Sequence, residues 1–226
     1  MTADDATYRV HIQLLRVRPP LWRRVEVPGS MTLDRLRLVV DTVMGWPGAG
    51  GEFVVGGSTR DPWSTPVRPL DVLAAEIARD RRTWSSLGFS AADLEVVEDD
   101  LLVEEQLTVR DVLPRDRSTL QYAYGIAWEH RLRVERITPG GAPPRPRCLA
   151  GRRAAPAQYL VNGWNYTEVL RLARAVAEGH GTPQEEAALA AHMPGLSPQE
   201  AWAALDGFDV LEADGLLRVL HEQGRV

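Results

Sequence analysis

Apolar and polar residues alternate in two stretches near the start of the chain, residues 8–17 and 21–27. A period of two residues is typical of a β-strand with one buried face and one face in solvent. Pro19-Pro20 lies between the two stretches and stops the first strand. We therefore predict two neighbouring strands that pair as a hairpin.

The next pattern has the spacing of a helix. Between residues 33 and 44, apolar side chains recur three and four positions apart, which places them on one helical face. Thr32 is a suitable N-cap residue, and Gly45 is a suitable residue for the end of the helix. We predict a helix over residues 33–44.

Short apolar runs separated by turn residues follow in the middle of the chain. Glycines bound a strand at residues 52–55, and Gly125 joins two further strands, 119–124 and 128–137, into a second hairpin. The order of strands and helices predicts an α+β fold, a β-grasp-like mixed sheet with one helix crossing it. Three other segments are expected to be a loop at 58–69, a short helix at 70–79 and one helical turn at 107–113.

The composition changes after residue 137. Residues 138–165 are rich in proline and glycine, which predicts an extended connection that packs on the sheet through its aromatic end. Thr182-Pro183-Gln184-Glu185 and Ser197-Pro198-Gln199-Glu200 are capping boxes with proline at the first helical position. We expect one compact unit with three parts: an α+β domain over 1–137, the connection over 138–165, and a helical segment over 166–226.

Charge and composition exclude several classes of protein. All 26 basic residues are arginine, so a Walker A loop and a Schiff-base mechanism, which both need lysine, are excluded. The net charge is −5, which predicts that any DNA binding is weak and salt-sensitive. No apolar run approaches the roughly 20 residues that span a bilayer, and no signal peptide is recognisable. Together with the single Cys148, this predicts a cytoplasmic protein without membrane contact.

The histidines do not suggest a metal site. No two of the five lie at the i, i+4 spacing of a zinc-binding helix, and Cys148 has no partner at CxxC spacing. We therefore expect no metal and no cofactor. His130, in Trp128-Glu129-His130, can be read as a general acid or base, because an unperturbed pKa near 6.5 suits that task. The other reading is a strand histidine with hydrogen bonds across the sheet.

Four motifs follow one another along the chain. They are Pro19-Pro20-Leu21-Trp22-Arg23-Arg24-Val25-Glu26-Val27-Pro28, the segment from Thr32-Leu33 to Met44-Gly45-Trp46, Trp128-Glu129-His130, and Pro146-Arg147-Cys148-Leu149-Ala150-Gly151-Arg152-Arg153-Ala154. In this order they resemble the plasmid pRiA4b ORF-3-like family, whose relatives include TnpR-like passenger proteins of transposable elements. The resemblance covers roughly residues 8–170 and implies an α+β domain of uncharacterised activity.

The chain also departs from this family where the family carries polar residues. The departures are Ala49-Gly50-Gly51-Glu52-Phe53 in place of an H-L-H motif, Tyr122-Ala123-Tyr124-Gly125-Ile126 in place of Y-D-F-G-D, and Ala155-Pro156-Ala157-Gln158-Tyr159-Leu160-Val161-Asn162 in place of C-P-P-E-D-C-G-G. Ligands for hard and borderline metals are lost, and the replacements lower the local polarity. A cleft at this place would be aromatic and uncharged, which suits an apolar small molecule.

We therefore predict a protein that binds a small molecule. An enzyme of specialised metabolism that acts on this molecule without a cofactor is one version of this prediction. The expected catalytic residues are His130, Glu129 and Arg23. The expected substrate-binding residues are Trp22, Trp46, Tyr122, Tyr124, Trp128, Tyr159 and Trp164, with the even-numbered Trp22 on the same face as His130. The same aromatic residues could instead form ordinary core.

Two other hypotheses stay open. The first is an accessory protein of a mobile element that contacts DNA or a recombinase through arginines. The arginines in question are Arg16, Arg18, Arg23 and Arg24. The second is a degenerate relative whose helical tail binds other proteins. The sequence does not determine the substrate or the oligomeric state.

Overall fold

The computed structural model describes residues 6–47, 51–55, 65–68, 102–125, 127–141, 143, 145–156 and 163–226. The strands are β1 (Thr7–Leu14), β2 (Leu21–Pro28), β3 (Gly51–Val55), β4 (Thr65–Arg68), β5 (Leu102–Val103), β6 (Thr119–Tyr124), β7 (Trp128–Thr138) and β8 (Arg147–Arg152). The helices are α1 (Leu33–Met44), α4 (Val109–Val112), α5 (Gly163–Ala177), α6 (Pro183–His192), α7 (Pro198–Asp206) and α8 (Val210–Glu222). This is the α+β fold that the sequence predicts.

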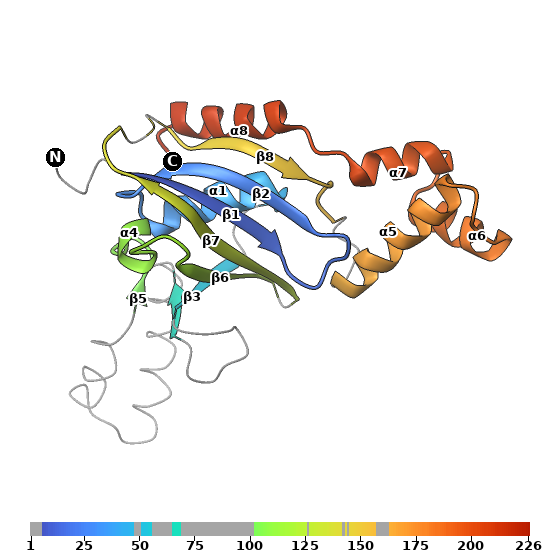
Figure 1. Cartoon of the computed structure of the whole chain (residues 1–226), viewed down its shortest axis with the longest axis horizontal. Coiled ribbons are helices and arrows are strands. Elements are labelled where there is room, and N and C mark those ends of the chain that lie inside the picture. The colour runs from blue at the N-terminus through green and yellow to red at the C-terminus, as the bar shows by residue number, and fades with distance from the viewer. Residues whose placement is uncertain are drawn as a thin grey trace, which may run out of the picture.

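The strands form one sheet in the order β5-β4-β3-β6-β7-β1-β2-β8. Both predicted hairpins are present: β1 pairs with β2, and β6 pairs with β7. The two hairpins meet along β1 and β7, which also run antiparallel. The only parallel pair among the described strands is β4 with β5. Figure 1 shows the sheet with α8 beside β8 and with α5, α6 and α7 grouped beyond one end of it.

Side chains of successive residues point to opposite faces of the sheet, and the two faces differ in burial. The inner face carries Ile12 and Leu132, which are fully buried, and α1 packs against this face. The outer face carries the intervening residues, for example His11 and Arg133, which lie opposite each other on β1 and β7. The core of the molecule therefore lies between the inner face and the helices α1 and α8.

Helix α1 begins and ends where the sequence predicts. Its buried residues include Leu36, Val40 and Val43, which lie on the face toward the sheet. Gly45 ends the helix with φ at 75°, in the left-handed region that glycine adopts without strain. The end of α1 thus has a fixed position against β2, where Arg23 donates a hydrogen bond to the Val43 carbonyl.

Two strands lie where the sequence predicts loop or connection. Residues 65–68 are β4, so the loop predicted over 58–69 is wrong for this part, because Val67 pairs with Phe53 of β3. The connection predicted over 138–165 contains β8, which pairs with β2. In both segments the strand forms through pairing with a distant strand rather than through local pattern. The helix predicted over 70–79 lies outside the described residues.

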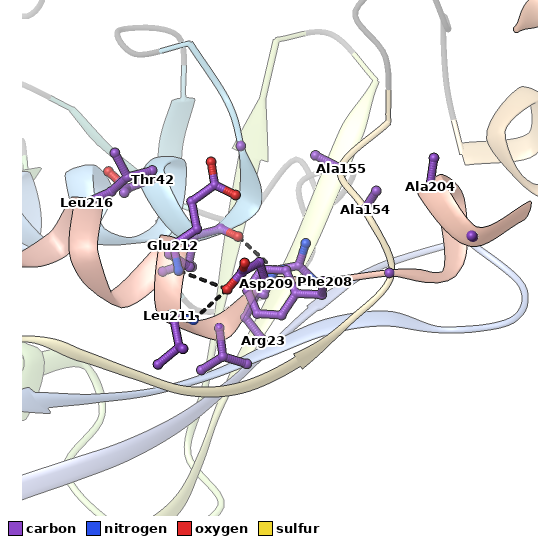
Figure 2. Close-up of a pocket in the computed structure, with 16 residues that line it drawn as sticks. Arg23, Thr42, Ala154, Ala155, Ala204, Phe208, Asp209, Leu211, Glu212 and Leu216 are labelled. Carbon is purple, nitrogen blue, oxygen red and sulfur yellow. Dashed lines mark hydrogen bonds between the residues drawn. The ribbon is translucent and has the colours of Figure 1, made fainter. Parts of the chain in front are cut away.

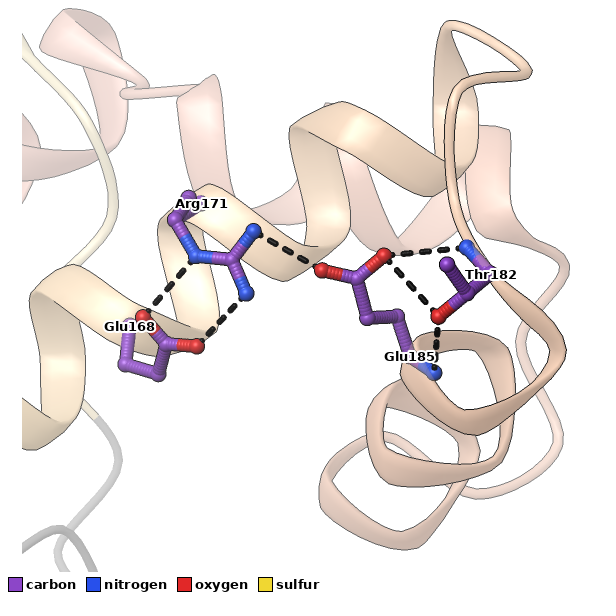
Figure 3. Close-up of polar contacts among 4 residues, drawn as sticks. All are labelled: Glu168, Arg171, Thr182 and Glu185. Carbon is purple, nitrogen blue, oxygen red and sulfur yellow. Dashed lines mark hydrogen bonds and ion pairs between the residues drawn. The ribbon is translucent and has the colours of Figure 1, made fainter.

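The C-terminal helices begin at the predicted capping boxes. In α6, the Thr182 side chain accepts a hydrogen bond from the Glu185 backbone, and the Glu185 carboxylate accepts one from the Thr182 backbone. Glu185 also contacts Arg171 of α5 at 2.9 Å, and Arg171 pairs with Glu168 (Figure 3). The cap of α6 is therefore linked to α5. None of the helices that the structure describes is long and apolar enough to cross a membrane.

Candidate functional site

Four of the predicted site residues on β6 and β7 lie together on the inner face. Tyr122 is opposite His130, and Tyr124 is opposite Trp128, so Gly125 does not shift the register of the hairpin. Trp46, just after α1, stacks on Tyr124 with 4.8 Å between ring centroids and lies 5.4 Å from the Trp128 ring. The rings form one cluster, in which Tyr124 is partly exposed and the others are buried: Trp46, Tyr122, Trp128 and His130.

His130 uses both of its ring nitrogens within this cluster. Nε2 lies 3.1 Å from the indole nitrogen of Trp46, whose N–H donates to it. Nδ1 lies 3.2 Å from the backbone oxygen of Tyr122, which can only accept, so the proton is assigned to Nδ1. Burial lowers the pKa of His130 to about 4, and the ring is neutral at physiological pH. In this arrangement neither nitrogen is free to exchange a proton with a substrate.

The other predicted site residues are elsewhere. Trp22 lies on the outer face, where its ring stacks on His11 with 5.4 Å between centroids. The prediction that Trp22 shares the face of His130 is wrong, because Leu14 pairs with both Leu21 and His130, which turns the odd-numbered residues of β2 inward. Glu129 forms an ion pair with Arg16 at 2.7 Å. Trp164, on α5, is 71% exposed, and Tyr159 lies outside the described residues.

Arg23 is on the inner face and is almost completely buried, with 1% of its surface exposed. Nε donates to the Val43 carbonyl at 2.7 Å, and Nη1 donates to the carbonyls of Trp22 and Arg152, each at 2.9 Å. Val43 is in the last turn of α1, where carbonyls lack helical partners and the helix dipole is negative. Burial lowers the pKa of Arg23 to about 10, so the side chain stays cationic near neutral pH.

The Phe208 ring covers the Arg23 guanidinium. The Arg23 Cζ atom lies 3.7 Å from the ring centroid, within the range of a cation–π contact. Gly151 of β8 makes this contact possible, because a Cβ atom there would lie 2.4 Å from the Phe208 ring and 2.8 Å from Arg23 Cδ. Neither Phe208 nor Gly151 is among the site residues that the sequence predicts. The glycine within the Pro146–Ala154 motif is the one signal that could have indicated a close contact.

A groove with a volume of about 710 Å³ opens beside this contact. We call it the Arg23 groove (Figure 2). It lies where the end of α1, the residues after β8, and the junction of α7 and α8 meet. At its rim, Asp209 caps α8 by accepting hydrogen bonds from the backbones of Leu211 and Glu212 at 2.8 and 3.0 Å. Its lining includes Arg23, Thr42, Ala155, Ala204, Phe208 and Leu216.

Two acidic side chains are buried on the other side of α1. Asp41 accepts a hydrogen bond from the Tyr122 hydroxyl, and Glu104 pairs with Arg37 at 2.8 Å. Burial raises the pKa of Asp41 to about 6 and that of Glu104 to about 7. Among the residues that the structure describes, no group of three or more histidine, cysteine, aspartate or glutamate side chains is arranged to hold a metal ion.

The fold and the groove define the class of this protein: an α+β protein with a single large sheet, a crossing helix and a C-terminal helical segment that completes a groove. The family model of the plasmid pRiA4b ORF-3-like protein matches residues 6–193, and the chain belongs to this family. This confirms the resemblance seen in the sequence motifs. Phe208 and α8 lie beyond the matched residues, whereas Arg23 lies within them.

The fold is similar to that of MM3350, a protein of unknown function from Methanosarcina mazei Go1 whose crystal structure is known. The TM-score is 0.57 at 19% sequence identity, over 91% of this chain and 96% of that chain. At this identity the likeness shows the fold alone. No curated protein matches the chain.

Proposed function

We propose that this protein binds a mostly apolar or aromatic small molecule in the Arg23 groove, without a metal. The observation that carries the proposal is the buried Arg23–Phe208 contact beside an open groove of about 710 Å³. This volume falls within the range of roughly 300–1,000 Å³ that is usual for ligand pockets. The predicted aromatic cluster around His130 is buried as core and is not itself the proposed binding site.

The lining of the groove favours an apolar ligand with few polar contacts. Alanines, Phe208 and Leu216 supply apolar surface, and Leu216 is 49% exposed although it is a large hydrophobic residue. An exposed leucine beside a partly exposed phenylalanine is the kind of surface that an apolar ligand would remove from water. A reaction on such a ligand would have to use the ionisable groups at the groove, which include Arg23, Asp209 and Glu212.

The test uses N-phenyl-1-naphthylamine, an uncharged aromatic probe whose fluorescence rises in apolar surroundings. We expect saturable binding to the wild-type protein and about tenfold weaker binding, or about 1.4 kcal/mol, to Ala204→Phe, which places an aromatic ring in the groove where the probe would lie. Ala204 is exposed and lines the groove, so the substitution does not disturb the core. The matched control is Ala191→Phe, at an exposed position of α6, which should bind as the wild type does.

Two results would contradict the proposal. One is the absence of saturable binding to the wild-type protein at about 100 μM probe, which corresponds to a free energy weaker than about −5.5 kcal/mol. The other is equal binding to Ala204→Phe and Ala191→Phe, which would place the probe outside the groove. Melting curves of both variants verify that each is folded.

A further inference from the structure

The outer face of the sheet is rich in arginine although the whole chain is acidic. Alternation along β1, β2, β7 and β8 turns these arginines to the same side, away from α1. The glutamates on this face are fewer: Glu26, Glu129 and Glu135. The arginines are Arg9, Arg24, Arg131, Arg133, Arg136 and Arg147, with Arg152 at the end of β8.

Some of these arginines are neutralised and others are not. Arg9 pairs with Glu26 at 2.9 Å, and Arg24 pairs with Glu135 at 2.6 Å. Arg131 and Arg133, two residues apart on β7, are exposed and form no ion pair with any side chain in the described part of the chain. Because strand residues rise about 3.3 Å each, their Cα atoms are roughly 6.6 Å apart along the strand.

Two aromatic rings lie on the same face between the arginines. Trp22 and His11 are stacked, and His11 is opposite Arg24 on one side and Arg133 on the other. Gln13 separates Trp22 from Arg131 in the same way. The central part of the outer face thus combines cationic groups, flat rings and an amide. Among the residues that the structure describes, no helix lies in front of β1, β2 and β7 on this side (Figure 1).

We propose that this outer face binds single-stranded nucleic acid. Arg131 and Arg133 would contact successive phosphates, and the Trp22–His11 pair would contact bases, since bases stack on aromatic rings irrespective of sequence. An open antiparallel sheet with aromatic and cationic side chains is a suitable platform for unstacked bases. Within the described residues, this face presents no helix or projecting ribbon that could enter the major groove of a duplex. An acidic protein surface would be complementary in charge to the arginines, but it would not provide flat groups that stack on the Trp22 and His11 rings.

The test measures the fluorescence anisotropy of a labelled oligo-dT strand as a function of salt. We expect binding to the wild-type protein at low salt, and at least about tenfold weaker binding to the double variant Arg131→Ala/Arg133→Ala. Since each phosphate contact on a single strand contributes about 0.7 to the slope of log K against log salt, the slope should fall by about 1.4. The control Arg35→Ala/Arg218→Ala removes two exposed arginines on α1 and α8 and should leave both quantities unchanged.

A second variant separates nucleic acid from other anionic partners. Trp22→Leu keeps the charge of the face, and we expect it to weaken oligo-dT binding about fivefold or more, because base stacking is lost. It should leave unchanged any binding of polyglutamate, which has no bases. The proposal is overturned if oligo-dT does not bind at low salt, or if both arginine variants bind it equally. It is also overturned if a duplex or polyglutamate binds as tightly as oligo-dT and Trp22→Leu has no effect.

Discussion

Arg23 holds a positive charge almost entirely out of water, and its surroundings show how this is possible. Three carbonyl oxygens accept its hydrogen bonds, and the Phe208 ring covers its flat face. One of those carbonyls belongs to Val43, in the last turn of α1, where a cation is favoured by the helix dipole. The side chain therefore joins β2, α1, β8 and the α7–α8 junction at one point.

Replacing Arg23 with an apolar side chain of similar length should destabilise the fold. We expect Arg23→Met to lower the free energy of unfolding by about 2–4 kcal/mol, because carbonyls that were bonded to a cation lose their partner in a buried place. Urea unfolding measures the change. Arg131→Met, at an exposed position of β7, is the control and should change the stability by less than about 0.5 kcal/mol. Equal effects of the two substitutions would mean that the buried contacts of Arg23 contribute little.

The pKa of His130 predicts a dependence of stability on pH. The pKa is about 4 in the folded protein and near 6.5 in the unfolded chain, so the unfolded chain binds the proton more readily. The contribution of His130 is therefore fully present above pH 6.5 and is lost as the pH falls from 6.5 to 4. The shift corresponds to about 3 kcal/mol at 1.36 kcal/mol for each pKa unit.

The measurement compares urea unfolding of the wild type and of His130→Asn between pH 4 and pH 7. Asp41 and Glu104, whose folded-state pKa values are raised, contribute the opposite trend in both proteins and cancel in the difference. The wild type should lose more stability than His130→Asn as the pH falls. Parallel curves for the two proteins would show that the pKa of His130 is not lowered by folding.

Most of the individual elements could be predicted from local pattern, whereas their distant partners could not. Helix α1, the two hairpins and the capped helices α6 and α7 follow from periodicity and cap residues. β8 lies in a proline-rich segment and forms by pairing with β2, a contact that no local pattern contains. The inner face of β2 does not follow from its pattern, because Arg23, a charged residue, occupies a buried position in the series Leu21, Arg23, Val25.

The candidate site was also predictable only in part, because it brings together residues that are far apart in the sequence. Arg23 and the β6–β7 residues could be named from their motifs, but Phe208 is far from them in sequence and lies in a short junction between helices. Nothing in the spacing of residues predicts that Phe208 returns to cover Arg23. The alternation along β6 and β7 predicts that their aromatic residues share a face, but the burial of these residues depends on how α1 and Trp46 pack against them.

Gly151 of β8 lies so close to Phe208 and Arg23 that a Cβ atom has no room there. Gly151→Ala should force the Phe208 ring away from Arg23, and we expect a loss of about 1–3 kcal/mol in the free energy of unfolding. Gly215→Ala, in α8, is the control: its Cβ would meet no atom within 4 Å, and alanine favours a helix by about 0.5–1 kcal/mol. Thermal melts should therefore shift in opposite directions. A Gly151→Ala variant as stable as the wild type would contradict the close contact.

The sheet separates two kinds of surface on the molecule. The inner face and the helices enclose the core and leave the Arg23 groove open at the junction of α1, β8 and α8. The outer face carries arginines and two stacked rings. The net charge of −5 averages over these surfaces and does not describe either of them.

The Arg23 groove is formed by elements that are far apart in the sequence. Arg23 comes from β2, whereas Phe208 and Leu216 come from the C-terminal helical segment, beyond the residues matched by the family model. If the C-terminal helices only stabilise the fold, no ligand is expected to bind at their junction with α1.

The most direct measurement is a crystal structure of the full chain soaked with N-phenyl-1-naphthylamine. If the Arg23 groove is the binding site, electron density for the probe will lie in it, in contact with Phe208, Leu216 and Ala155. This density will be absent from crystals of Ala204→Phe. Density for the probe only elsewhere, for instance among α5, α6 and α7, or in the same place in both proteins, would contradict the assignment of the groove as the binding site.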